Sequence, residues 1–135
     1  MIAEARRRSG KAGSGRAAAG QLKQAIGTAR ACGPCGTIMV RGDSAFGTKK
    51  VIATCCAEHV EFSLSVTRNR AITNAIETID EDAYTPVHYP GAVEHPDTGQ
   101  LISDAEVAET PYPLRLGRHR TLIVRLVVRR VKDAR

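Results

Sequence analysis

The stretch TIMVRGDSAFG, residues 37–47, joins a short apolar run to a lone carboxylate, Asp43, and then to a Ser-Ala-Phe-Gly turn. The continuous apolar run predicts a strand over Thr37–Arg41 that is covered on both faces. A carboxylate at the C-terminal end of a buried strand lies where open α/β sheets hold metals and substrates. We therefore expect an α/β fold with a candidate site at Asp43.

Amphipathic patterns flank this stretch on both sides. A helix is predicted over Arg16–Ala31, capped by Ser14 and ended by Gly33. A second helix is predicted near Thr48–Ala57, with Thr48 as its cap. Alternating apolar residues then predict a half-buried strand over Glu61–Thr67. The order helix, strand, helix, strand predicts two adjacent parallel strands joined by a right-handed crossover.

The second half of the chain begins with one more helical pattern, Ile72–Ile79, which ends in the acidic run Asp80-Glu81-Asp82. Such a run at an exposed helix end is typically solvated. From Tyr84 onward, proline, glycine and turn signals separate short apolar segments. The last segment, Thr121–Val131, alternates as a strand does, with four aliphatic residues on one face and Arg125 and Arg129 on the other.

Length and composition suit one globular domain: 135 residues, 42% hydrophobic and 25% charged. The net charge of +6 is unevenly distributed, with +8 over residues 1–50, −9 over 51–114 and +7 over 115–135. Basic ends suit a protein that binds phosphates, although an arginine-rich composition alone explains the charge equally well. The sequence contains neither a signal peptide nor a membrane span, so we expect a cytoplasmic protein.

Several blocks, taken in order, resemble the DDE transposases of bacterial insertion sequences. They are RSGKAGSGRAA, the VRGDSAFG of the opening stretch, FSLSVTRN, DAYTPVHYPGAV, TGQLISDAEVAETPY and RLVVRRV. In that family the pattern V-R-x-D-S-x-[Y/F]-G contains the second metal-binding aspartate of an RNase H-like catalytic domain, and Asp43 matches it. Glu106 and Glu109 match a block that lies outside the family's catalytic triad.

The resemblance implies a partial RNase H-like mixed sheet with flanking helices, followed by part of a β-rich insertion. It divides the chain into a basic flexible segment at 1–15, a partial catalytic core at 16–82 and a partial β-rich insertion at 83–135. The family needs three carboxylates, and its first aspartate and its glutamate have no counterpart here. We therefore expect an internal fragment of a transposase, inactive alone.

For chemistry, the resemblance implies Mg²⁺ or Mn²⁺ as cofactor, weakly bound or unbound by this fragment, with Asp43 as the catalytic and metal-binding residue. It implies DNA as partner, at transposon ends and target, and a homodimer for the full-length enzyme. Lys49, Lys50, Arg125 and Arg129 are the candidate DNA-binding residues. Viewed without the resemblance, Asp43 is more often a turn-forming residue and such lysines are usually solvated.

The cysteines offer a competing hypothesis, because Cys32-Gly33-Pro34-Cys35 spells a thioredoxin-type dithiol. In that chemistry the first cysteine opens a helix, whereas here a helical pattern precedes it, which favours a structural role. Adjacent Cys55 and Cys56 point in different directions on a helix and do not suit a shared zinc site. The alternatives left open are a catalytically dead DNA-binding remnant, a non-functional pseudogene product and, last, a thiol-disulfide oxidoreductase.

Overall fold

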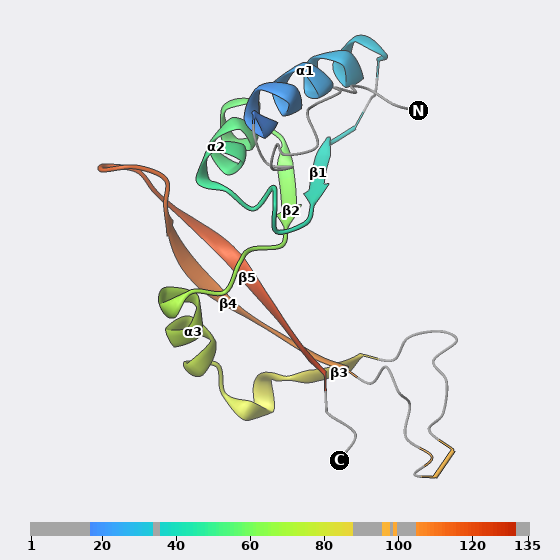
Figure 1. The fold of residues 1–135 in the computed structure, drawn as a ribbon, viewed down its shortest axis with the longest axis vertical. Helices are drawn as coiled ribbons and strands as arrows, with labels where there is room; N and C mark the ends of the chain where they lie inside the picture. The colour runs from blue at the N-terminus through green and yellow to red at the C-terminus, as the bar shows by residue number, and fades with distance from the viewer. Residues whose placement is uncertain (1–16, 34–35, 88–95, 98, 100–104, 132–135) are drawn as a thin grey trace, which may run out of the picture. The chain divides into compact units, whose positions relative to one another are not determined.

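The computed structural model describes residues 17–33, 36–87, 96–97, 99 and 105–131. It groups the chain into two compact units, residues 1–67 with 115–120 and residues 68–114 with 121–135. Among the described residues, the first unit carries two α-helices and a parallel pair of strands, and the second carries one α-helix, a 3₁₀ turn and an antiparallel sheet (Figure 1). This mixed architecture confirms the predicted α/β class. The boundaries at residues 15 and 82 remain predictions.

The first unit begins with helix α1, Ala18–Ala31, followed by strand β1, Met39–Gly42. The residue before α1, Ala17, has a left-handed backbone and gives no side-chain cap, and the predicted cap Ser14 lies outside the described residues. The helix ends as predicted, because Gly33 has a φ of 76° that favours glycine. Pro34 and Cys35 lie outside the described residues.

Helix α2, Lys49–Ala57, connects β1 to strand β2, Glu61–Leu64. The predicted cap is confirmed, since the Thr48 hydroxyl accepts a hydrogen bond from the Val51 amide at 3.3 Å. The two strands are parallel, with Met39 opposite Glu61 and Gly42 opposite Leu64. Figure 1 shows them side by side. The predicted strand–helix–strand unit is therefore confirmed, with β1 shifted slightly along the sequence and β2 ending three residues early.

The core of the first unit lies between the two helices and one face of the strand pair. Five buried residues form it: Ala18, Ile26, Val51, Cys55 and Val60. Val40, Phe62 and Leu64 pack against this core, whereas Met39 is 54% exposed on the opposite face. The prediction of a strand covered on both faces is therefore wrong for the described residues, because only one face of β1 has helices packed on it.

The second unit starts with helix α3, Arg70–Glu77, which the Asn69 side chain caps by accepting from the Ile72 amide. A 3₁₀ turn, η1, Glu81–Ala83, leads into strand β3, Thr85–Val87. Strand β3 pairs antiparallel with the start of strand β4, Ala105–Arg115, with Val87 opposite Ala105. Strand β5, Thr121–Val131, completes the sheet in the order β3-β4-β5.

Strands β4 and β5 form a long twisted hairpin (Figure 1). Residues 116–120 link them, and the Leu116 amide donates to the Arg120 carbonyl at 2.9 Å. The alternation predicted for Thr121–Val131 is confirmed along its whole length: the even-numbered aliphatic residues are half-buried, and the odd-numbered positions are exposed. None of the helices in the described part of the chain has the length and apolar character needed to cross a membrane.

Candidate active site and basic surfaces

Asp43 follows β1 directly and begins the turn that leads to α2. Its Oδ1 accepts a hydrogen bond from the Ala45 amide at 3.0 Å, and its carbonyl accepts from the Phe46 amide at 3.0 Å. The side chain is exposed. The turn thus uses one carboxylate oxygen of Asp43, which lies at the C-terminal end of a strand as the sequence predicted.

Two glycines hold the backbone around Asp43 close to β2. A Cβ built on Gly47 would lie 2.1 Å from the Ser65 carbonyl oxygen, which no real side chain tolerates. A Cβ on Gly42 would lie 3.0 Å from both the Leu64 and the Phe46 side chains. The Ser65 amide also donates to the Gly42 carbonyl at 3.0 Å, which extends the strand pairing by one bond. The close approach at Gly47 explains the final glycine of the motif, and a side chain at Gly42 would press on Leu64 and Phe46.

The donor set around Asp43 does not by itself fit a divalent cation. Mg²⁺ and Mn²⁺ take several oxygen ligands, and one carboxylate rarely suffices. Over the residues that the structure describes, no three or more His, Cys, Asp or Glu side chains come together in a way that could hold a metal ion. Asp43 therefore offers a single acidic ligand, and the described residues do not by themselves form a catalytic metal site.

Lys49 and Lys50 form the first turn of α2 and are both exposed. They lie six and seven positions after Asp43, on the far side of the turn that the Asp43 carboxylate stabilises. The first turn of a helix favours negative charge, and α2 has no acidic residue there. Two lysines at this place therefore weaken the helix slightly.

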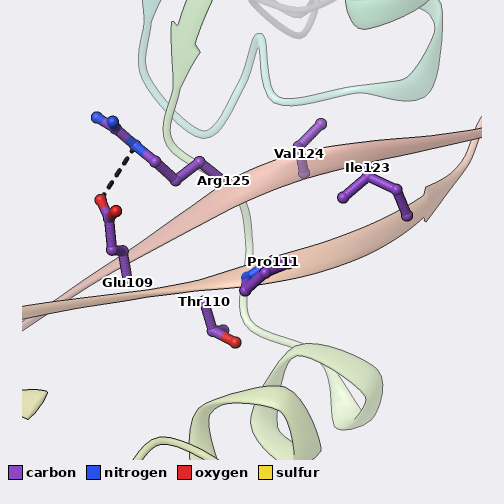
Figure 2. Close-up of a pocket in the computed structure, with 6 residues that line it drawn as sticks. All are labelled: Glu109, Thr110, Pro111, Ile123, Val124 and Arg125. Atoms are coloured by element: carbon purple, nitrogen blue, oxygen red, sulfur yellow. Dashed lines mark ion pairs between the residues drawn. The ribbon is translucent and has the colours of Figure 1, made fainter.

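Arg125 and Arg129 lie at exposed positions of β5, as predicted. Figure 2 shows that Arg125 extends toward Glu109 of β4, and its Nε lies 3.1 Å from Glu109 Oε2. The structure groups these arginines with one unit and the two lysines with the other. The four predicted DNA-binding residues therefore form two separate pairs, each on its own structural element.

A cluster that no sequence pattern predicted surrounds Arg130, which lies near the end of β5. Its guanidinium binds both carboxylate oxygens of Glu81, at 3.0 and 2.7 Å, and also Glu106 Oε2 at 2.8 Å. It stacks 3.7 Å from the centre of the Tyr84 ring. Hydrogen bonding from Arg130 lowers the pKa of the Glu81 carboxyl and, in return, the pKa of Arg130 is raised.

The acidic run is exposed, as the sequence predicted. Glu81, within this run, also makes a two-bond ion pair with Arg130. Glu106 is a buried charge, 8% exposed, that Arg130 compensates. The only signal in the sequence was one of composition, an acidic segment followed by a basic one, and it did not identify which residues pair.

The cysteines occupy structural positions in the described residues. Cys32 caps the C-terminal end of α1 and therefore follows a helix instead of opening one. Cys55 is fully buried in the core of the first unit, and burial, with a smaller contribution from Cys56, raises the pKa of its thiol. Both observations support the structural interpretation of these residues. A pairing of Cys32 with Cys35 lies outside the described residues.

The family model described as "Transposase DDE domain group 1" matches residues 1–125. No curated protein and no solved structure matches the chain significantly. The matched range contains Asp43, both glycines beside it, the two lysines and Arg125.

Proposed function

The chain belongs to the DDE transposase family, and we propose that it is part of a cut-and-paste transposase in which Asp43 is a catalytic, metal-binding carboxylate. The observation that supports this role most directly is the place of Asp43. It follows a parallel strand, in a turn that two closely packed glycines define. In α/β sheets, this is the position from which side chains reach a ligand.

Enzymes of this family use divalent metal ions, which activate the attacking oxygen and stabilise the leaving oxygen at phosphorus. Asp43 would contribute one ligand to such an ion. Its Oδ1 is held by the Ala45 amide, so the carboxylate is oriented before any metal arrives. Preorganised ligands of this kind lower the cost of forming a site. We propose that the RNase H-like arrangement supplies the remaining carboxylates in the complete enzyme.

We further propose that this chain does not cleave DNA alone. Two-metal catalysis needs several acidic ligands, and the described residues bring no group of three together. DNA binding is a separate property and rests on the basic pairs Lys49–Lys50 and Arg125–Arg129. We also propose DNA as the substrate, a cytoplasmic location for the protein and a homodimer for the full-length enzyme.

A nicking assay tests the proposal. The purified chain is incubated with supercoiled DNA and either Mg²⁺ or Mn²⁺, beside its Asp43→Asn variant. Asparagine keeps the acceptor for the Ala45 amide and removes only the charge. We expect no nicking by either protein, together with weak duplex binding that both share. Nicking by the unmodified chain that disappears in Asp43→Asn would contradict the proposal.

A catalytically dead remnant that only binds DNA is the second candidate. The single acidic ligand and the exposed basic pairs favour it equally well. Adding the unmodified chain to an extract whose transposase lacks the matched domain distinguishes the enzyme part from the DNA-binding remnant. Restored strand transfer that depends on Asp43 supports the enzyme part, whereas DNA binding without restoration supports the remnant. A chain without a cooperative unfolding transition would indicate a pseudogene product.

A further inference from the structure

We propose that Glu109 competes with DNA phosphates for Arg125, and so limits the affinity of the β4–β5 hairpin for DNA. The inference rests on the proposed DNA binding of Arg125. It concerns a residue that the motif comparison left without a role.

The geometry supports direct competition at one side chain. Arg125 Nε lies 3.1 Å from Glu109 Oε2, and the two side chains are 73% and 58% exposed. Figure 2 shows them turned toward each other from neighbouring strands. A carboxylate and a phosphate both bind the in-plane N–H groups of a guanidinium group. Glu109 therefore lies against the Nε of Arg125, which a phosphate oxygen would otherwise use.

The pair is weak enough to be exchanged. Exposed ion pairs contribute little, because water screens them and two long side chains lose freedom. Arg130 of the same strand differs, since two carboxylates and an aromatic ring hold its guanidinium group in place. Binding a phosphate would break several contacts at Arg130 and one at Arg125. Of these two arginines, Arg125 is therefore the one for which a phosphate can compete with a carboxylate.

Space for an incoming group lies beside the pair. A shallow hollow of about 330 Å³ adjoins it, lined by Glu109, Thr110, Pro111, Ile123, Val124 and Arg125. Figure 2 shows Ile123 and Val124 beside Arg125 on β5, and Thr110 and Pro111 beside Glu109 on β4. The hollow offers a phosphate oxygen room near Arg125.

A double-mutant cycle tests the inference with duplex DNA of random sequence at low salt. The variants are Glu109→Gln, Arg125→Gln and the double variant, each with glutamine to keep a polar, uncharged side chain. Glu77→Gln is the matched control, because it removes one negative charge from the exposed end of α3. We expect Glu109→Gln to tighten DNA binding about two- to five-fold, the range that an exposed ion pair allows.

The decisive outcome is the behaviour of the double variant. If Glu109 acts through Arg125, Glu109→Gln changes nothing once Arg125 is glutamine, and Glu77→Gln has a smaller effect in both backgrounds. An equal gain in both backgrounds would indicate general charge repulsion and overturn the inference. If Arg125→Gln weakens binding while Glu109→Gln has no effect, the inference fails and the proposed DNA binding stands. If Arg125→Gln has no effect either, the DNA-binding role of Arg125 fails as well.

Discussion

Gly47 has no room for a side chain, because its Cβ would lie 2.1 Å from the Ser65 carbonyl oxygen. Gly47→Ala must therefore move the backbone of the turn that carries Asp43. We expect the free energy of unfolding to fall by about 2 kcal/mol or more, the range for strain at a fixed backbone position. Urea denaturation monitored by circular dichroism measures it.

Gly20→Ala is the control for this change. Gly20 lies in α1, where a Cβ meets no atom within 4 Å. Alanine is the better helix former, so this variant should be more stable by up to about 1 kcal/mol. Replacing glycine by alanine should thus lower the free energy of unfolding at Gly47 and raise it at Gly20. Equal effects at both would show that the close approach at Gly47 is not real.

At the scale of elements, Lys50 at the start of α2 separates stability from binding. Lys50→Glu replaces an unfavourable charge in the first helical turn by a favourable one. We expect a gain of about 0.5 kcal/mol in the free energy of unfolding and, at the same time, weaker DNA binding. Thermal unfolding and a filter-binding assay on the same preparation measure both. If Lys50→Glu lowered both the free energy of unfolding and the affinity for DNA, Lys50 would have a structural role.

The contact between η1 and β5 should depend on pH. Arg130 lowers the pKa of Glu81, so the ion pair stabilises the fold above the ordinary glutamate pKa of about 4.3. This contribution is lost as the pH falls through the lowered pKa of the folded state. We expect the unfolding free energy of the unmodified chain to fall more steeply in this acidic range than that of Glu81→Gln. Parallel pH profiles would contradict the pairing.

Local patterns made the first unit predictable. The Thr48 cap, the Gly33 end of α1 and the alternation of Phe62 and Leu64 each depend on neighbouring residues, and the structure confirms all three. Strand β4 was not predicted in detail, because Pro111 and Pro113 interrupt its sequence. The structure places both beyond the short segment that pairs with β3, where a missing amide costs less.

The Arg130 cluster could not be predicted for a different reason. Its partner Glu81 is 49 residues away along the chain, and Glu106 is 24 residues away. No periodicity in the sequence marks contacts of this length. For the candidate site, the place of Asp43 was predicted from the strand and the motif. The partner of Arg125 was not, since Glu109 had been assigned no role.

At the scale of the whole molecule, the affinity for DNA should fall steeply as the salt concentration rises. Each phosphate that a lysine or arginine neutralises steepens the dependence of log K on log salt concentration by about 0.9. Replacing Lys49, Lys50 or Arg129 by glutamine should therefore make the slope less steep by nearly one unit each. Affinities measured across a salt series test this. A slope that does not change in any of these variants would place the DNA elsewhere on the protein.

The pattern of β5 has a further consequence for the state of the protein at high concentration. Ile123, Val127 and Val131 are exposed on the face that also carries Arg125 and Arg129, and β5 is an edge strand among the described strands. A long edge strand with exposed aliphatic residues tends to pair with other chains and aggregate. The two arginines interrupt this stripe and act as gatekeepers that keep copies of the hairpin apart. Loss of these arginines would therefore also favour intermolecular β-pairing, so the surface that we propose to bind DNA phosphates would also protect the chain from aggregation.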